Sequence, residues 1–284
     1  MAGIDSPKDP LVPTAWLAER LGDPDVRVVD ATLPLVGQPG KGRDFYDAGH
    51  IPGAVFFDVN AIADPDTDLP HMLPSPAAFA RDVGALGLGR EHTIVVYDAH
   101  GLYSAARVWW SLRAMGYRDV FVLDGGLRKW RAEGRPVDTA GPTPSPVAVS
   151  LAFEPDLVAD IADIEQAIGD GSAQIVDARS SARFTGAAPE PRATLRSGHM
   201  PGAKNLPFTD LVAGDGTLKP ADELRAAFAH VDLGRPIITS CGSGVTAAVL
   251  ALALARLGRF DVAVYDGSWT EWGGRPDTDV VTGA

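Results

Sequence analysis

The sequence predicts an α/β protein of two tandem domains, each a mostly parallel sheet with helices on both faces. Three observations lead to this prediction. Segments of the first half recur in the second half in the same order. Short apolar runs that end in Asp, typical of buried parallel strands, occur in both halves. Longer apolar stretches that close with Gly, as helices often do, lie between these runs.

The expected elements follow the same order in both halves. In the first half the strands are VRVVD at 26–30, TIVVYD at 93–98 and DVFVLDGG at 119–126, and the helix is SAARVWWSLRAMG at 104–116. In the second half the strands are AQIVD at 173–177, PIITSC at 236–241 and DVAVYDGS at 261–268, and the helix is VTAAVLALALARLG at 245–258.

The spacing of matching residues indicates a duplicated domain. His50 of GHIPGA and His199 of GHMPGA lie 149 residues apart, and Asp124 and Asp266 lie 142 apart. Solenoid repeats have far shorter periods. We therefore expect two domains and a linker rich in Pro, Gly and Thr. Their predicted ranges are 1–138 for the first domain, 139–152 for the linker and 153–284 for the second domain.

Composition excludes several classes of protein. The 284 residues are 45% hydrophobic, which is enough for two buried cores, and the net charge of −12 disfavours binding to nucleic acid or to an anionic membrane. The longest strongly apolar run, 245–255, is too short to span a bilayer, and the N-terminal segment lacks the pattern of a secretory signal. A single cysteine excludes an internal disulfide and a four-thiolate zinc site. We expect a cytoplasmic protein without a metal.

His50 and His199 are conspicuous because each domain has one. The interpretation that we favour is structural, with each ring bracing a tight Gly-Pro turn before a strand. One histidine in each half also lacks the partners of a metal site.

The only cysteine, Cys241, follows a predicted strand in TSCGSGVTAA at 239–248. The glycines of this loop can take backbone conformations that other residues resist, so that successive N–H groups point to one place. The next helix, expected to begin near Val245, directs its positive dipole end there. An accessible thiol in such surroundings is held as a thiolate nucleophile. The predicted anion-binding loop consists of Gly242, Ser243, Gly244, Val245 and Thr246. The alternative is an inert, buried cysteine.

Comparison of the halves assigns the chemistry to the second one. Asp98 takes the position of Cys241 in the first half, which is therefore expected to be the non-catalytic copy. Two other cysteine chemistries do not fit. A C-x5-R phosphatase loop needs Arg where this chain has Ala247, and a C-x-x-C oxidoreductase needs Cys where it has Gly244. The remaining hypothesis is a thiol that accepts a small, soft group and passes it on.

The tandem halves, Asp98 in the first copy and CGSGVT in the second resemble the two-domain rhodanese superfamily of sulfurtransferases over nearly the whole chain. Members that prefer thiosulfate usually have C-R-K-G-V-T, whereas Gly242-Ser243 resembles the 3-mercaptopyruvate sulfurtransferases. The resemblance implies a Cys241 persulfide, release of pyruvate, and transfer of sulfur to thioredoxin, a small thiol or cyanide, with no cofactor. A thiosulfate:cyanide sulfurtransferase and a non-catalytic rhodanese-like binding or sensing module are the alternatives.

The same resemblance assigns roles to further residues. Arg183 in ARFTG and Arg192 in PEPR match the arginines that grip the carboxylate of the donor, and guanidinium groups suit that task. The alternative for each arginine is a surface charge paired with Glu190 or water. Arg179, directly after a strand, is expected to brace the fold. Arg196 is left without an assignment.

Proton transfer is assigned to Ser243 and His71. The family links this serine to a histidine, matched by His71 in PHMLPS, and to an acid. The position of the acid is Asn60 in this chain, and Asn can orient an imidazole but cannot hold a charge. A helix-capping role is the alternative for Ser243. Trp269 has no aromatic counterpart in the first half, so it lines either the cleft or, as we favour, the core.

Overall fold

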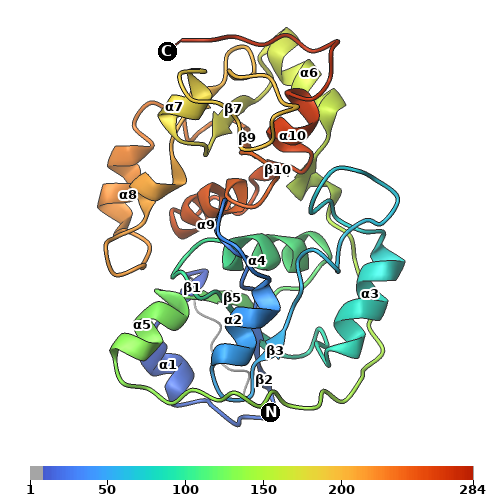
Figure 1. Cartoon of the computed structure of the whole chain (residues 1–284), viewed down its shortest axis with the longest axis vertical. Coiled ribbons are helices and arrows are strands. Elements are labelled where there is room, and N and C mark those ends of the chain that lie inside the picture. The colour runs from blue at the N-terminus through green and yellow to red at the C-terminus, as the bar shows by residue number, and fades with distance from the viewer. Residues whose placement is uncertain (1–8, 284) are drawn as a thin grey trace. The chain divides into compact units, whose positions relative to one another are not determined.

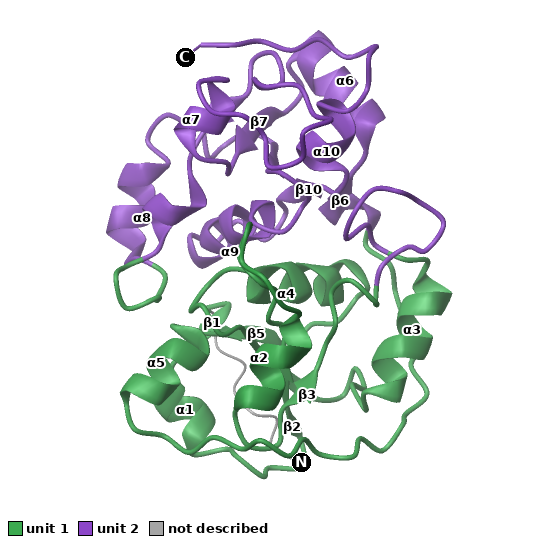
Figure 2. Ribbon diagram, in the orientation of Figure 1, with its two compact units in different colours: residues 1–62, 74–154, 213–218 green, residues 63–73, 155–212, 219–284 purple. Residues whose placement is uncertain are grey.

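The computed structural model describes residues 9–283, which form two compact units (Figures 1 and 2). Unit 1 comprises the described chain up to Ile62 together with Pro74–Glu154 and Ala213–Leu218. Unit 2 comprises Ala63–Leu73, Pro155–Val212 and the chain from Lys219 onward.

These units differ from the continuous domains that we expected. The segment 63–73 from the first half packs in unit 2, and 213–218 from the second half packs in unit 1. The expected linker also belongs to unit 1, where the N–H of Val147 donates to the carbonyl of Gly84 at 3.0 Å.

Matching hydrogen bonds fix the two exchanged segments. The N–H of Leu73 donates to Asp266 Oδ2 at 2.7 Å, and the N–H of Leu218 donates to Asp124 Oδ1 at 2.8 Å. Asp124 and Asp266 are one of the repeated pairs of the sequence. Each acceptor lies directly after a strand, and its partner comes from the other half of the chain. The exchange is therefore part of the duplicated architecture.

Unit 1 contains a five-stranded parallel sheet in the order β1-β5-β4-β2-β3. Its elements are β1 (Leu11–Val12), α1 (Thr14–Ala18), β2 (Val26–Asp30), α2 (Gly42–Ala48), β3 (Val55–Phe56), α3 (Pro76–Ala85), β4 (Thr93–Tyr97), α4 (Ala105–Ala114), β5 (Val120–Leu123) and α5 (Gly126–Ala132).

Unit 2 repeats this order of strands as β6-β10-β9-β7-β8, again all parallel. Its elements are η1 (Pro155–Leu157), β6 (Val158–Ala159), α6 (Ile161–Asp170), β7 (Gln174–Asp177), α7 (Ser181–Phe184), β8 (Lys204–Asn205), η2 (Phe208–Leu211), α8 (Ala221–Ala227), β9 (Ile237–Ser240), α9 (Ala247–Arg256), β10 (Ala263–Tyr265) and α10 (Ser268–Trp272). The predicted α/β class and the duplication are confirmed.

Helices flank both sheets (Figure 1). In unit 1, side chains of α1, α2 and α5 form one buried cluster with alternate residues of β2, β4 and β5, while α4 contacts β4 and β5. The strands are short and almost wholly buried because helices cover the sheet. In a parallel sheet all carboxyl ends lie at one edge, so the loops after β9 and β10 meet there.

None of the helices among residues 9–283 is long and apolar enough to cross a membrane.

Candidate active site

Cys241 lies directly after β9, at the carboxyl edge of the unit 2 sheet. Its carbonyl accepts the N–H of Trp269 at 3.0 Å, and the carbonyl of Gly242 accepts the N–H and the hydroxyl of Thr270 at 2.8 and 2.6 Å. The first turn of α10 therefore binds the cysteine loop. Cys241 is only 2% exposed, in contrast to the accessible thiol that we expected, whereas the next residues, Gly242 and Ser243, are half-buried.

The backbone amides of the loop fall into two sets. The N–H groups of Cys241 and Gly244 donate to Ser268 Oγ at 3.2 and 3.1 Å, and Ser268 Oγ in turn donates to the carbonyl of Tyr265. Ser268 thus binds the amide of Gly244, which we had expected at the anion site, together with that of Cys241. Within residues 9–283, four other loop amides donate no hydrogen bond to the protein: those of Gly242, Ser243, Val245 and Thr246. These four can still bind an anion. Helix α9 begins at Ala247, with Thr246 as its N-cap.

The corresponding loop of unit 1 shows what such amides do. There the Asp98 carboxylate accepts the N–H groups of His100, Tyr103 and Ala105 at 2.9, 2.7 and 2.9 Å. Asp98 is completely buried, so the loop after β4 encloses its own anion. The loop after β9 has a thiol at this position and keeps amides without acceptors.

His71 lies beside Ser243. It is part of the exchanged segment 63–73 of unit 2, and its Nδ1 is 3.2 Å from Ser243 Oγ. The structure thus brings together the two residues that the family resemblance assigned to proton transfer. Asn60 belongs to unit 1, and its side-chain amide makes no hydrogen bond within residues 9–283.

Two residues beside the cysteine loop have a strained backbone. Within residues 9–283 the non-glycine residues with positive φ are His71, at +67°, and Ser268, at +49°. In the repeat, Gly126, at +54°, matches Ser268. The counterpart of His71 is Gly216, at +90°. Each of these residues lies two positions before the leucine of its exchanged segment, Leu73 or Leu218. Left-handed backbone is unfavourable for residues with a side chain, so a side chain retained there points to function.

A buried ion network lies next to the loop. Arg179 donates to Asp177 at 2.7 Å and to Glu190 at 2.9 Å, and it is fully buried, which confirms the bracing role. Burial by itself lowers the pKa of the Arg179 guanidinium, but the two carboxylates outweigh it and raise that pKa. Arg183 donates to the same Glu190 at 2.5 Å. Arg183 Nη2 lies 3.2 Å from where a Cβ on Gly242 would be, so Arg183 lies against the cysteine loop.

The remaining arginines of this segment differ in their contacts. Arg192 is exposed, and its guanidinium makes no hydrogen bond within the part of the chain that the structure describes. Arg196 donates to the carbonyls of Trp272 and Thr278 and so fastens the C-terminal segment. Of the two predicted carboxylate-binding residues, Arg183 is placed by Glu190, and Arg192 is free to bind an anion.

The structural roles predicted for the repeated histidines are confirmed. His50 Nδ1 lies 2.8 Å from the carbonyl of Tyr46, and the two rings stack at 3.9 Å. His199 makes the same contacts with Phe184. Its Nδ1 lies 2.9 Å from the carbonyl of Phe184, and the centroids of the two stacked rings are 3.8 Å apart. Trp269 is fully buried and donates from Nε1 to the carbonyl of Arg196, so it belongs to the core.

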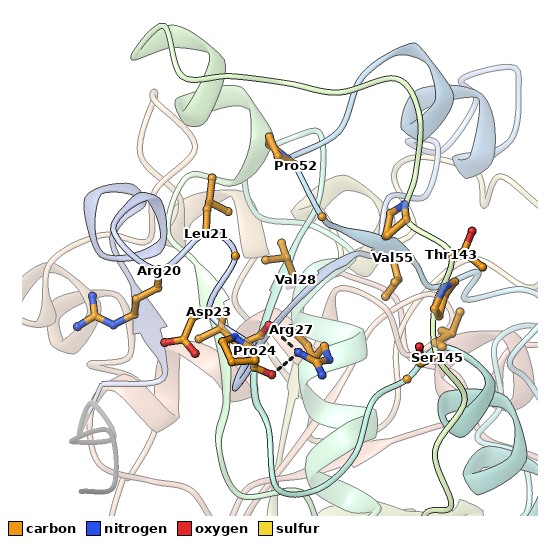
Figure 3. Close-up of a pocket in the computed structure, with 17 residues that line it drawn as sticks. Arg20, Leu21, Asp23, Pro24, Arg27, Val28, Pro52, Val55, Thr143 and Ser145 are labelled. Atoms are coloured by element: carbon orange, nitrogen blue, oxygen red, sulfur yellow. Dashed lines mark hydrogen bonds between the residues drawn. The ribbon is translucent and has the colours of Figure 1, made fainter. Parts of the chain in front are cut away.

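A pocket of about 320 Å³ in unit 1 lies away from these loops, at the amino ends of β2 and β3 (Figure 3). Arg27 lines it and is bound by the carbonyls of Pro24 and Val26. No predicted site residue lines this pocket. Residues 9–283 contain no group of three or more His, Cys, Asp or Glu side chains that could hold a metal ion.

Sequence reasoning missed two residues of the site. Ser268 was visible only as the difference between DGS in the second half and DGG in the first. Glu190 was considered only as a surface partner of an arginine, whereas it is buried between two of them.

Comparison with known proteins gives one consistent result. The family model of the rhodanese-like domain matches residues 13–133 and 160–275. The chain is 45% identical to the 3-mercaptopyruvate sulfurtransferase of Escherichia coli K12, covering 93% of this chain and 95% of that protein. It is 43% identical to the mitochondrial thiosulfate/3-mercaptopyruvate sulfurtransferase 1 of Arabidopsis thaliana, covering 97% and 79%. The crystal structure of SseA from Escherichia coli matches with a TM-score of 0.83 at 43% identity, over 92% of this chain and 99% of that one.

Proposed function

The chain belongs to the rhodanese family, and from this premise we propose that it is a transferase that moves the sulfur of 3-mercaptopyruvate through a Cys241 persulfide to a thiol or cyanide. The observation that carries the proposal is the loop after β9. It places a thiol beside amides that have no acceptor in the described protein, whereas the loop of unit 1 uses such amides to bind a carboxylate.

The Asp98 carboxylate indicates where the transferred sulfur would lie. A carboxylate oxygen is three bonds from its Cα, and so is the outer sulfur of a cysteine persulfide. In the aligned loops, the amide of Ser243 matches that of His100, which binds Asp98. The N-caps Thr246 and Ser104 also match, so the amide of Val245 corresponds to that of Tyr103, which likewise binds Asp98. The outer sulfur, which carries the negative charge, would therefore receive these amides of the unit 2 loop.

The first half-reaction transfers sulfur to Cys241. The thiolate attacks the donor's sulfur, a sulfur–sulfur bond forms, and the carbon–sulfur bond breaks with its electron pair moving to carbon. The resulting enolate takes a proton and becomes pyruvate, and the donor thiol supplies a proton that balances it. Because Gly242 and Ser243 are the half-buried residues beside the sulfur, we propose that the donor approaches on their side.

Ser243 and His71 would move this proton. Their 3.2 Å separation allows the imidazole to accept a proton from the hydroxyl or return one to it. Arg183 and Arg192 would bind the carboxylate of the donor, Arg183 from beside Gly242.

The second half-reaction restores the thiolate. An acceptor thiolate attacks the outer sulfur, the sulfur–sulfur bond breaks, and Cys241 leaves with the electron pair. Thioredoxin, a small thiol or, in an assay, cyanide can serve as the acceptor. This chemistry uses no metal or organic cofactor, because the sulfur atom is itself the carried group. We place the reaction in the cytoplasm. Fractionation of cells tests that location, since the Arabidopsis relative is named mitochondrial.

The second candidate function is a thiosulfate sulfurtransferase, which the double name of the Arabidopsis relative favours. Thiosulfate carries two negative charges, and Gly242-Ser243 gives the loop no cation of its own. We therefore expect a higher kcat/KM with 3-mercaptopyruvate. An equal or higher kcat/KM with thiosulfate would reverse this choice of donor.

The central test is the intact mass of the protein after incubation with 3-mercaptopyruvate. The wild type should gain the mass of one sulfur atom and release pyruvate, and addition of a thiol should remove that mass. Cys241→Ser should gain nothing. A wild type that gains no sulfur from either donor would contradict the enzyme and support a non-catalytic binding module.

A further inference from the structure

The four paired acidic and basic side chains beside the cysteine loop have no net charge. Asp177 and Glu190 are paired with Arg179 and Arg183 at distances of 2.5 to 2.9 Å. The side chains of both carboxylates and of Arg179 are at most 1% exposed, and that of Arg183 is 23% exposed. Two cations and two anions therefore form a closed group without net charge. Arg183 is its member nearest to Gly242.

Glu190 is the residue that joins this group together. Its Oε1 accepts from Arg179, and its Oε2 accepts from Arg183 Nη2, while Arg183 Nε lies 3.3 Å from Oε1. One carboxylate thus fixes the position of Arg183 and also offsets its charge. A donor that meets Arg183 has a planar set of hydrogen-bond donors in front of it, but little net positive potential.

The fold does not require this group. Unit 1 has the same strand order. At the end of β2, the N–H of Thr32 donates to Asp30 Oδ1 at 2.9 Å. The N–H of Arg179 makes the matching hydrogen bond to Asp177 Oδ1 in unit 2, at 2.8 Å. Unit 1 has Thr32 where unit 2 has Arg179. The buried ion network is therefore a property of the copy that contains the cysteine.

We propose that Glu190 is a specificity-determining residue that selects the donor by its charge, and this inference rests on the proposed sulfur transfer. Its negative charge limits the attraction that Arg183 and Arg192 exert on anions. A donor with one carboxylate is bound well enough by directed hydrogen bonds. Thiosulfate, with two charges, loses more from the missing positive potential, because Coulomb energy is proportional to the charge of the ligand.

The test compares donors in the full-length protein. Glu190→Gln keeps an oxygen acceptor for Arg179 but removes the charge. We expect the ratio of kcat/KM for thiosulfate to kcat/KM for 3-mercaptopyruvate to rise on the order of tenfold, mainly through KM for thiosulfate. Glu190→Asp keeps the charge and should hold the ratio within about twofold of the wild type. If Glu190 acted in folding alone, its replacement would change kcat/KM for both donors by the same factor.

Two further variants make the outcome decisive. Glu223→Gln, at an exposed position of α8, changes the net charge equally and should leave the ratio unchanged. Asp177→Asn removes the other carboxylate of the group and should shift the ratio in the same direction, which keeps the proposal testable if Glu190→Gln does not fold. An unchanged ratio in a folded Glu190→Gln that still takes up sulfur would overturn the inference. Absence of sulfur uptake in the wild type would instead overturn the proposed function.

Discussion

Ser268 shows how one side chain prepares the loop for its chemistry. It holds a left-handed backbone at φ +49°, and its hydroxyl accepts the amides of Cys241 and Gly244. The matching residue of unit 1, Gly126, has nearly the same φ without a side chain. The strain at Ser268 is therefore offset by two hydrogen bonds that only the loop with the cysteine needs.

Replacing Ser268 should separate these two effects. Ser268→Ala keeps the strain and removes the hydroxyl that accepts two buried amides, which should lower the free energy of unfolding by about 2 kcal/mol. Ser268→Gly loses the same acceptor but relieves the strain, so it should be more stable than the Ala variant by about 1 kcal/mol. Thermal unfolding compares the two, and sulfur uptake at Cys241 should fall in both. A Gly variant less stable than the Ala variant would contradict this account.

Residues of this kind mark the limit of what the sequence reveals. Cys241, Ser243 and His71 were predicted because their types and motifs stand out, and the structure places His71 next to Ser243. The anionic partner of Arg183 was weighed only as a surface charge, because spacing along the chain does not reveal burial. The pairing of Glu190 with two arginines depends on how a loop without regular structure folds back on itself.

At the scale of elements, the strand–loop–helix segments that follow β4 and β9 are two copies of one structure, and the first copy binds a carboxylate. The first contains Asp98 and is complete, with three amides bound. The second contains Cys241 in place of Asp98, and its amides of Gly242, Ser243, Val245 and Thr246 have no acceptor within residues 9–283. The strands and helices of both were predictable from apolar runs and closing glycines, since these patterns are local.

Asp98 should accordingly be structural. Asp98→Ala leaves three amides without their acceptor, two of which belong to buried residues, and should lower the free energy of unfolding by about 3 kcal/mol. Sulfur uptake at Cys241 should persist in the folded protein. The matched control is Asp47→Ala, whose exposed carboxylate pairs with Arg43 and should contribute less than about 0.5 kcal/mol. Equal losses of stability in the two variants would exclude an anion-binding role for the unit 1 loop.

At the scale of the whole molecule, the repeat predicted two copies of one fold but not the exchange of segments between them. Residues 63–73 and 213–218 are short, lack regular structure and could pack with either unit as far as their composition shows. Their positions are fixed by hydrogen bonds to Asp266 and Asp124, which are far away in the sequence. The exchange also places His71, from the first half of the chain, in unit 2 with Cys241.

The pH dependence of stability should reside in part in unit 1, at His92. Its ring is nearly buried, and Nε2 lies 2.9 Å from Arg27 Nη2. Burial, followed by the Arg27 cation, lowers the pKa of His92 below its ordinary value of 6.5, despite the nearby Glu91. The unfolded chain therefore binds a proton at a pH where the folded chain does not. Stability from this group is complete above pH 6.5 and is lost as the pH falls toward the lowered pKa.

Replacing His92 should remove this part of the pH dependence. We expect His92→Gln to have a lower Tm than the wild type at pH 8, and the difference should become smaller at pH 5, where the wild type has lost the contribution of the neutral imidazole. His230→Gln, at an exposed position of unit 2, should follow the wild type at both pH values. A difference in Tm between His92→Gln and the wild type that is the same at pH 8 and pH 5 would show that His92 contributes packing alone.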